Sequence, residues 1–167
     1  MAPEILYRVC YGTHDFSNDT FKADLAASLS IKPAILHDYC RHRVEQADYP
    51  GIIPEKGHTV RGTYVTGLTE HDIMHLDAFE GSEYRRRKVK VVLLKPDAHN
   101  DLVESGGEVQ TETYVFTAGF HRLEKEEWDY EVFRKEKMYR WVDQSVEYEG
   151  KALFPGYCGC MLTWNRG

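Results

Sequence analysis

Alternating hydrophobic and polar positions mark several short segments of this chain and predict β-strands. These segments cover residues 59–66, 87–94 and 111–117, with a further candidate at residues 36–45. Residues 5–11 are also rich in apolar side chains and lead into a glycine, which predicts an N-terminal strand that ends in a turn. The pattern therefore predicts a sheet of up to five strands.

Helical periodicity marks three other segments, which cover residues 19–29, 70–80 and 124–142. The last of them carries an apolar stripe, typical of a helix that packs on a sheet, formed by Trp128, Val132, Tyr139 and Val142. Residues 96–107 are rich in Asp, Asn, Ser and Gly and are expected to form a surface loop between two strands. This order of strands and helices indicates an α+β domain.

Glu80 stands out because it is a carboxylate among apolar neighbours at the end of the predicted 70–80 helix. With Thr69 as the N-cap, the helical period places Ile73, Leu76, Asp77 and Glu80 on one face, which points Glu80 towards the core. A carboxylate that loses its hydration has a raised pKa and is suited to act as a general base or acid. Repulsion from a nearby Asp77 would raise one of the two pKa values further.

A structural role for Glu80 is the alternative at this point. Its carboxylate would then cap the helix or form an ion pair with Arg85, Arg86 or Arg87. The local pattern favours neither interpretation over the other.

The predicted strand end at Tyr11-Gly12-Thr13-His14 is the second candidate site. A glycine there allows backbone N–H groups to approach a ligand closely, and several such amides together form a small anion-binding concavity for a carboxylate or a phosphate. Strands also end in glycine simply to turn, so this segment alone identifies no ligand.

Composition indicates one compact domain and excludes several partners. The chain has 167 residues, of which 42% are hydrophobic, enough for one sizeable core. Its net charge of −6 argues against nucleic-acid binding, and the basic run Arg85–Lys88 is interpreted as a solvated strand face. No apolar stretch approaches the roughly 20 residues of a membrane span, and the N-terminus lacks a secretory signal pattern. We therefore expect a cytoplasmic protein without a membrane partner.

No metal site is expected from the sequence. Cys158-Gly159-Cys160 is spaced more tightly than zinc or thioredoxin motifs, so the cysteines at positions 10, 40, 158 and 160 are expected to be free thiols. His71 and His75 have the i, i+4 spacing of a zinc metalloprotease helix, but they fall opposite Glu80 on the helical wheel and should face water.

Four motifs in order resemble the γ-glutamylcyclotransferase-like superfamily, specifically its AIG2-like branch, which includes the γ-glutamylamine cyclotransferases. They are Tyr11-Gly12-Thr13, Tyr49-Pro50-Gly51-Ile52-Ile53-Pro54, Val60-Arg61-Gly62-Thr63-Tyr64, and Leu76-Asp77-Ala78-Phe79-Glu80-Gly81 with Tyr84, Arg86 and Val89. The resemblance spans roughly residues 5–142, and His14 stands where the family usually has Leu. The resemblance predicts a domain at residues 1–142. It leaves an aromatic C-terminal extension at residues 143–167, which we expect to pack on the same domain or on a partner chain.

The resemblance implies a fold and a reaction. The expected fold is a small mixed-sheet β-barrel flanked by helices. In the expected reaction, the α-amine of a γ-glutamyl compound attacks its own γ-carbonyl, which releases 5-oxoproline and an amine or amino acid. This intramolecular acyl transfer requires no cofactor, because nucleophile and carbonyl belong to one molecule.

By the same resemblance, Glu80 is the general base and then the general acid. The amides of Tyr11, Gly12, Thr13 and His14 would hold the γ-glutamyl head, while Tyr84 and Tyr114 would line the pocket. Two alternatives remain: a different γ-glutamyl acyl transfer, or a non-catalytic module that binds a small carboxylate or a protein. The sequence leaves the leaving group open, and the chain is expected to be a monomer or homodimer.

Overall fold

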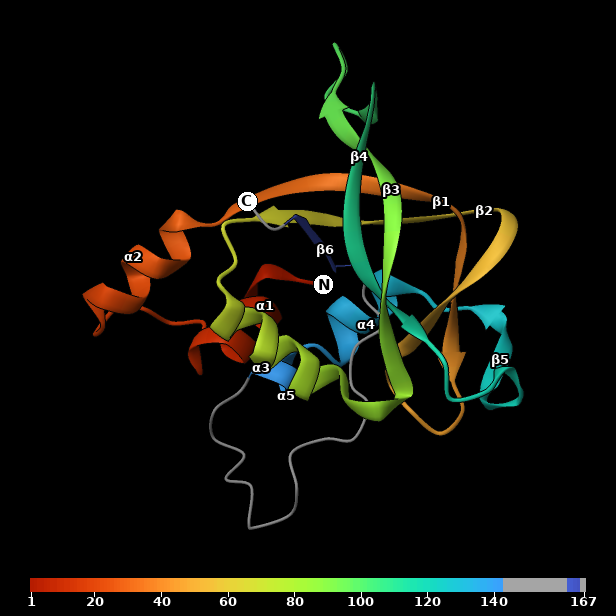
Figure 1. The fold of residues 1–167 in the computed structure, drawn as a ribbon, viewed down its shortest axis with the longest axis horizontal. Coiled ribbons are helices and arrows are strands. Elements are labelled where there is room, and N and C mark those ends of the chain that lie inside the picture. Colours follow the sequence, from red (N-terminus) through yellow and green to blue (C-terminus); the bar gives the residue numbers. More distant parts are fainter. Residues whose placement is uncertain (143–161, 166–167) are drawn as a thin grey trace.

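The computed structural model describes residues 1–142 and 162–165, which form a mixed sheet with helices gathered on one side (Figure 1). The helices are α1 (Pro3–Tyr11), α2 (Thr20–Ser28), α3 (Glu70–Glu80), α4 (Tyr130–Glu136) and α5 (Tyr139–Val142), with short 3-10 turns at Gly81–Glu83 and Phe120–Arg122. The strands are β1 (Ser30–Val44), β2 (Pro50–Thr66), β3 (Tyr84–Pro96), β4 (Leu102–Phe116), β5 (Leu123–Glu127) and β6 (Leu162–Asn165).

Two long antiparallel hairpins make up most of the sheet. Strands β1 and β2 pair along nearly their whole length, as do β3 and β4. The strand order is β2-β6-β4-β3-β1-β5, with an additional pairing between β2 and β1, and β6 runs parallel to β2. The predicted α+β class and mixed sheet are therefore confirmed.

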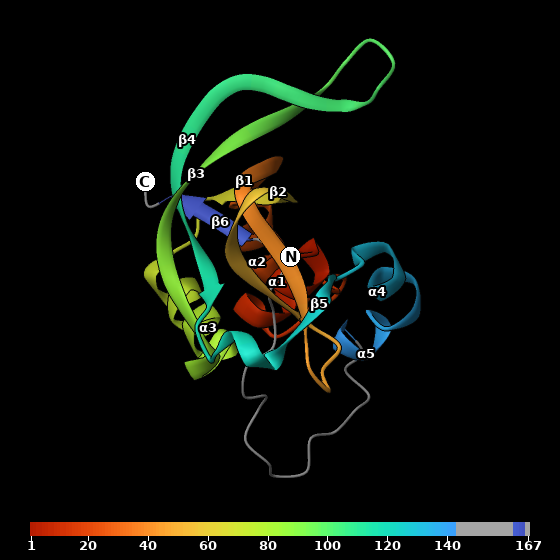
Figure 2. The same ribbon diagram turned by 90° about the vertical axis from the view of Figure 1, so that its right-hand side faces the viewer.

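Helices α1 and α3 contact each other and lie below the long strands β1 and β2 in Figure 1, and Figure 2 shows the same helices from the side. The main core fills the space between them and the strands, and it contains Leu6, Leu76, Tyr84 and Phe116 among its buried side chains. Each apolar group removed from water contributes to stability in proportion to its buried area, so this layer fixes how α3 sits on β3 and β4. Among the described residues, no helix is both long and apolar enough to cross a membrane.

The segment expected as an N-terminal strand is a helix instead. Pro3 stands in the first turn of α1, and Gly12 ends the helix in the left-handed conformation with φ 75°. Ala2, Ile5 and Leu6 are buried, an i, i+3, i+4 spacing that suits a helix packed on one side. The strand prediction was wrong because it weighed the apolar content of residues 5–11 above this spacing and above the Pro and Gly at the two ends.

The predicted helix at residues 124–142 was also wrong in its extent. Residues Leu123–Glu127 form β5, and the chain becomes helical only after Asp129, whose carboxylate accepts hydrogen bonds from the backbone N–H groups of Glu131 and Val132. This N-cap interrupts the long stripe that the periodicity suggested. Phe133 is the buried side chain of α4, whereas Val132 is 44% exposed.

Other expectations agree with the structure. Helices α2 and α3 match the predicted helices at residues 19–29 and 70–80, and four predicted strands lie within or close to β1 to β4. The predicted loop at residues 96–107 is shorter, because β4 already begins at Leu102. Of the expected C-terminal extension, residues 162–165 form β6 between β2 and β4, and residues 143–161 and 166–167, with Cys158 and Cys160, lie outside the described residues.

Candidate functional site

Helix α3 begins at a capping box that fixes its position. The hydroxyl of Thr69 accepts a hydrogen bond from the backbone N–H of Asp72 at 3.2 Å, and the Asp72 carboxylate accepts one from the backbone N–H of Thr69 at 2.8 Å. These bonds satisfy two of the N–H groups that a helix start leaves without intrahelical partners. The helix ends at Gly81, whose φ of 65° with ψ of −157° is a conformation that favours glycine. Glu80 is therefore held as the last residue of α3.

Glu80 points into the protein, as the helical period predicts. Its exposed fraction is 1%, and Ile73 and Leu76 on the same face are 3% and 0% exposed. Tyr84 and Tyr114, which the resemblance placed in the pocket, are buried as well. Burial, a hydrogen bond to Asp77 and the negative charges of Asp77 and Glu80 raise the pKa of Tyr114 above its ordinary value. Glu80 and Tyr114 are thus close enough to interact electrostatically.

The two tyrosine hydroxyls are held by hydrogen bonds within the protein. Tyr84 donates to the backbone carbonyl of Pro50 at 3.1 Å, and Tyr114 donates to Asp77 Oδ1 at 2.7 Å. Both hydroxyls are thereby held in fixed orientations, and Tyr114 lies close enough to Glu80 to feel its charge.

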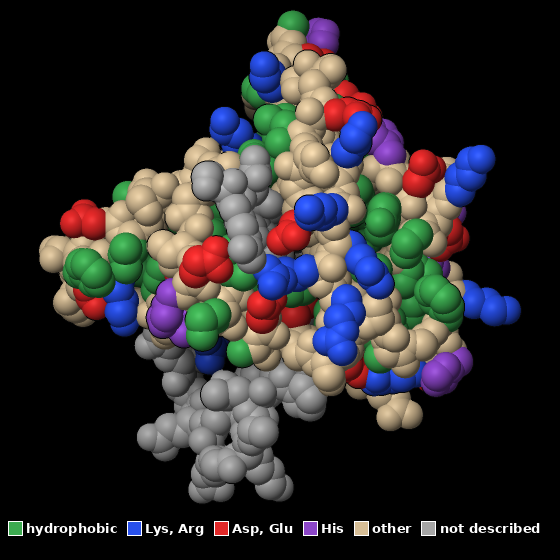
Figure 3. Space-filling model, viewed as in Figure 1, with side chains coloured by type: hydrophobic (Ala, Val, Ile, Leu, Met, Phe, Trp, Pro, Cys, Tyr) green, Lys and Arg blue, Asp and Glu red, His purple; other side chains and the backbone are tan. Residues whose placement is uncertain are grey.

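Asp77 is half-exposed, in contrast to the buried Glu80. Its side chain is 41% exposed, and its Oδ1 lies 3.2 Å from Arg86 Nε as well as accepting from Tyr114. Arg86 also lies 3.6 Å from Glu112, so this arginine is engaged by two other carboxylates. Arg85 and Arg87 are exposed on β3. Figure 3 shows Lys and Arg side chains gathered over β3 and β4, in agreement with a solvated strand face.

A cavity of about 1300 Å³ lies on the other face of α3. The side chains that α3 contributes to its wall include His71, His75 and Phe79, and Tyr11 and Gly12 contribute from the end of α1. Glu80, Tyr84 and Tyr114 are not part of the wall, and neither are Thr13 and His14. The structure thus brings Glu80 near Tyr114, which shares a core cluster with Tyr84, and it places Tyr11 and Gly12 at a cavity across the helix.

The backbone at Tyr11–His14 differs from the anion-binding turn that a strand end predicted. The N–H of Gly12 donates to the carbonyl of Arg8 at 2.9 Å and so completes the end of α1. Thr13 Oγ1 accepts from the N–H of Asp15 at 3.0 Å, which shapes the following turn. A helix C-terminus carries partial negative charge from its carbonyls, which is opposite to the field that attracts an anion. The assignment of Tyr11, Gly12, Thr13 and His14 to substrate binding therefore depends on the resemblance alone.

His71 and His75 lie on the cavity face of α3, opposite Glu80, as the helical wheel predicted. The prediction that both face water is confirmed only in part. His71 is exposed, whereas His75 is half-buried and its Nδ1 lies 3.1 Å from the carbonyl of Cys10. Because a carbonyl oxygen only accepts, Nδ1 of His75 carries the proton and donates. Burial, with a smaller contribution from the charge of Asp72, raises the pKa of the Cys10 thiol to about 12. The thiol is accordingly neutral at physiological pH.

The cavity also contains cationic side chains that the sequence analysis missed. Arg8, Arg122 and Arg140 line it from α1, the 3-10 turn before β5, and α5. Arg122 forms an ion pair with Glu83. These arginines come from segments that are far apart in the sequence, and no local motif links them. The carboxylates of Glu45, Asp48 and Asp72 line the same cavity, so its wall carries charges of both signs.

Comparisons with known proteins agree with the four sequence motifs. The family profile described as "Gamma-glutamyl cyclotransferase, AIG2-like" matches residues 9–130. Protein AIG2 B of Arabidopsis thaliana is 32% identical over 124 residues, which cover 74% of this chain and 68% of that protein. Protein AIG2 C of the same plant is 29% identical over 134 residues, which cover 80% of this chain and 68% of that protein.

One solved structure from the same plant is also similar. It is a solution structure of an Arabidopsis thaliana protein with 28% sequence identity and a TM-score of 0.48. The match covers 68% of this chain and 63% of that one.

Proposed function

The chain belongs to the γ-glutamyl cyclotransferase, AIG2-like family, and from this premise we propose that it is a cyclotransferase that converts a γ-glutamyl amine, amino acid or peptide into 5-oxoproline. The observation that supports this proposal is the position of Glu80. Its carboxylate is 1% exposed at the end of α3, in the same core region as Tyr84 and Tyr114. A charged group in such a water-poor setting interacts more strongly with a substrate than it would in solution.

In the proposed reaction, Glu80 takes a proton from the α-ammonium of the substrate. The free amine then attacks the γ-carbonyl carbon, which forms the new ring C–N bond and a tetrahedral oxyanion. Collapse of this intermediate breaks the original amide bond: protonated Glu80 gives its proton to the leaving nitrogen, then takes the second proton from the ring nitrogen and passes it on, so that the amine leaves as an ammonium ion. The products are 5-oxoproline and the amine, and the carboxylate is regenerated.

Tyr84 and Tyr114 are proposed to orient the substrate before the attack. Their hydroxyls are held by hydrogen bonds to Pro50 and Asp77, which would fix the positions of the two rings against the substrate. The amides of residues 11–14 are proposed to hold the γ-glutamyl head, as in the family. The pairing of β1 with both β2 and β3 supports the further proposal that the sheet closes into the family's barrel around this site.

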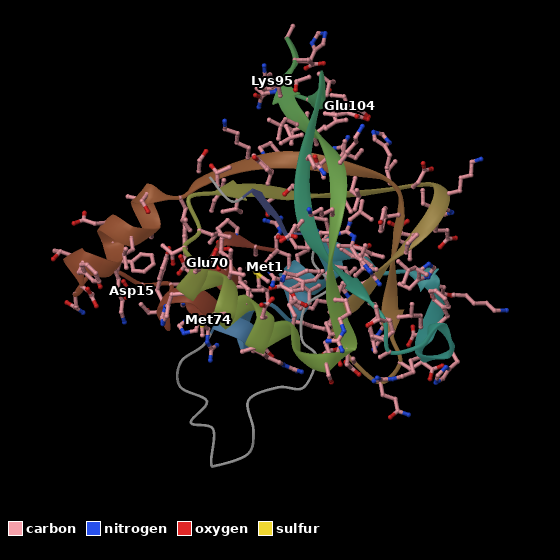
Figure 4. The ribbon with its side chains drawn as sticks, viewed as in Figure 1. Met1, Asp15, Glu70, Met74, Lys95 and Glu104 are labelled. Carbon is pink, nitrogen blue, oxygen red and sulfur yellow. The ribbon has the colours of Figure 1, made fainter. Side chains whose placement is uncertain are left out.

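Access to Glu80 requires α1 to move in this proposal. Met1, Ile5 and Leu6 belong to the same core cluster as Tyr84 and Tyr114, and Figure 4 shows Met1 between α3 and the sheet. A shift of α1 away from α3 would open a path from the cavity side to the carboxylate. The hydrogen bond from His75 to Cys10 is one contact that such a shift would break.

A second candidate function follows from the cavity. Because the cavity lies across α3 from Glu80 and is lined by arginines, a non-catalytic protein could bind a small carboxylate there. Glu80 would then serve the packing of α3. This candidate predicts ligand binding that is insensitive to the charge of Glu80.

The deciding experiment incubates the full chain with a panel of γ-glutamyl compounds and measures 5-oxoproline by mass spectrometry. Glu80→Gln retains the shape of the side chain and removes the base, so the rate is expected to fall by about 10²- to 10⁴-fold. Glu70→Gln changes an exposed carboxylate of the same helix and should leave the rate unchanged.

Two results would overturn the proposal: full activity in Glu80→Gln, or no product from any compound in the panel. In the second case, binding of each compound is measured by calorimetry with Glu80→Gln and with Phe79→Ala, which alters the cavity wall. Binding that depends on Phe79 but not on Glu80 would support the carboxylate-binding module.

A further inference from the structure

Five side chains with metal-binding atoms gather around Cys40, apart from both the cavity and Glu80. The sulfur of Cys40 and donor atoms of His42 and Glu55 lie within 4.8 Å of one another, and the same limit holds for Cys40, His58 and Glu127. None of the five lines the cavity. They come from β1, β2 and β5, so their meeting is a product of the fold rather than of a local sequence motif.

The geometry of the strands explains this meeting. Cys40 and His42 are two residues apart on β1 and therefore point to the same side of the sheet. Glu127 of β5 is paired directly with His42, which places their side chains next to each other. Glu55 follows Ile53, the partner of Cys40, by two residues and so shares its face.

A bulge between β1 and β2 adds His58 to the group. The β1–β2 pairing shifts register between His37 and Tyr39, and the intervening Asp38 has a positive φ of 59°. Opposite it, the N–H of Gly57 donates to Asp38 Oδ1 at 2.9 Å. Bulges redirect side chains in this way, and here Nε2 of His58 comes to 3.4 Å from Glu55 Oε1.

The hydrogen bonds of His42 point to a cation beside it. Its Nδ1 lies 3.0 Å from the backbone carbonyl of Glu124, and because a carbonyl only accepts, Nδ1 must carry a proton. In the neutral ring, Nε2 then presents a lone pair, yet it lies 2.7 Å from the carboxylate oxygen Oε2 of Glu55. Two electron-rich atoms at this separation share a proton, and a metal ion that replaced this proton would move them apart to somewhat more than ~3 Å, since each ligand atom lies about 2.0–2.2 Å from zinc.

Several features of this cluster suit a metal ion in place of the proton between His42 and Glu55. A histidine ligand of a metal usually donates its other ring N–H to a carbonyl or carboxylate, as His42 does to Glu124. Thiolate, imidazole and carboxylate together form a ligand set that suits zinc. We propose that Cys40, His42 and Glu55 bind a Zn²⁺ ion, with His58 as the fourth ligand and Glu127 as a neighbouring carboxylate; the thiolate and the carboxylate of Glu55 together neutralise the charge of the ion.

Burial supports an ordered site with an open side. Cys40 is 1% exposed, and the side chain of His42 is 12% exposed, so two ligands are held inside the protein. The side chains of Glu55 and His58 are 38% and 49% exposed and provide the route by which an ion enters. The ion would tie β1 to β2 at their bulge. This role is structural and is independent of the proposed cyclotransferase reaction.

Metal titration of the full chain tests the proposal. After treatment with a chelator, Zn²⁺ binding is measured by calorimetry, and Co²⁺ is added in parallel because its absorption spectrum reports thiolate ligation and tetrahedral geometry. The measurements use a background in which Cys158 and Cys160 are replaced by Ser, so that these thiols do not contribute. We expect one equivalent of Zn²⁺ and a Co²⁺ spectrum with a thiolate charge-transfer band.

Variants of the ligands separate this site from adventitious binding. Cys40→Ser should remove the charge-transfer band, and His42→Gln and His58→Gln should each weaken Zn²⁺ binding by at least about tenfold. His37→Gln is the matched control, because His37 lies on the same strand and pairs with Glu104 at 3.1 Å outside the cluster. Folding of each variant is checked by circular dichroism, and His58→Gln, at an exposed position, keeps the test valid if a buried variant fails to fold.

The proposal is overturned by any of three results. These are the absence of stoichiometric Zn²⁺ binding, a Co²⁺ spectrum without the thiolate band, or ligand variants that bind as tightly as His37→Gln. In those cases a proton occupies the space between His42 and Glu55, and the cluster is an ion pair. Since 5-oxoproline formation is measured separately, a failure here leaves the cyclotransferase proposal untouched.

Discussion

The two faces of α3 differ in what they offer to chemistry. The inner face buries Glu80 with Leu76 against β3 and β4, where two tyrosine hydroxyls are held in place but almost no surface is open to solvent. The outer face carries His75 and Phe79 and borders a cavity of about 1300 Å³ with several cationic groups. One face thus has the buried carboxylate of Glu80 without open space, and the other borders open space with His71, Asp72 and His75.

This contrast shows that burial and accessibility have to be judged separately when a site is located. A buried carboxylate is a strong indication of function because removing its hydration is costly. A large cavity is an equally common indication. In this protein the two indications lie on opposite sides of one helix, and the reaction proposed above would require α1 to move before they can meet.

The largest expected effect concerns the packing of the inner face. Leu76→Ala removes a fully buried side chain and should lower the free energy of unfolding by about 2–5 kcal/mol. Met74→Ala, on the same helix but 65% exposed, should change it by no more than about 0.5 kcal/mol. Urea denaturation of both variants measures the difference. Equal effects would show that α3 is not anchored by its inner face.

The second expected effect concerns the stability contribution of Cys10, which lines the cavity on the outer side of α3, and it depends on pH. The thiol of Cys10 has a pKa of about 12 in the folded protein and an ordinary value of 9.0, so the folded state holds this proton more tightly. Its contribution to stability is complete below pH 9 and is lost as the pH rises from 9 to 12, by at most about 1.4 kcal/mol per pH unit.

Cys10→Ala should make the decline of unfolding free energy above pH 9 less steep, measured by urea denaturation at a series of pH values. Met74→Ala is the control and should decline in parallel with the unchanged chain. Parallel decline of Cys10→Ala itself would contradict the burial of this thiol between α1 and α3.

A smaller effect tests the polar part of the inner face. Tyr114→Phe removes the hydrogen bond to Asp77 and should cost about 0.5–1.5 kcal/mol of unfolding free energy. If the proposed reaction occurs at this face, the variant should also slow 5-oxoproline formation. Tyr139→Phe, at a 56% exposed position, should alter neither quantity. A Tyr114→Phe variant with lowered stability and full activity would restrict this tyrosine to packing.

The smallest expected effect concerns the hydrogen bond between His75, on the outer face of α3, and the backbone carbonyl of Cys10 in α1. His75→Ala leaves the carbonyl of Cys10 without its imidazole donor and should cost about 1 kcal/mol or less. His71→Ala, one turn earlier and exposed, serves as the control. If movement of α1 admits the substrate, His75→Ala should raise the rate of amide hydrogen exchange in α1. Unchanged exchange would indicate that this bond does not hold the two helices together.

Local sequence signals predicted much of the fold. The N-cap at Thr69 and the apolar period located α3 and the inward direction of Glu80, because both signals act within one or two helical turns. Residues 5–11 were predicted wrongly, since a short apolar segment is compatible with a strand or a helix. The N-cap at Asp129 was overlooked, and the predicted helix was therefore too long at its start.

The site was less predictable because its parts come from distant segments. Tyr114 and Asp77 meet through the packing of α3 on β4, and the arginines of the cavity meet through the packing of α1, α5 and the turn before β5. No period or short motif encodes such contacts, which depend on tertiary packing. The cluster around Cys40 has the same origin, since it depends on a bulge that shifts the register between β1 and β2.

Strand β6 has a consequence for how the chain acquires its structure. Thr63 of β2 pairs with Leu162, a partner that is synthesised about a hundred residues later. Contacts so distant along the chain slow folding, because a long loop must close before they form. Until β6 arrives, β2 and β4 present backbone groups that another strand could pair with. Nascent chains on the ribosome would therefore be the form of this protein most exposed to aggregation and most in need of a chaperone.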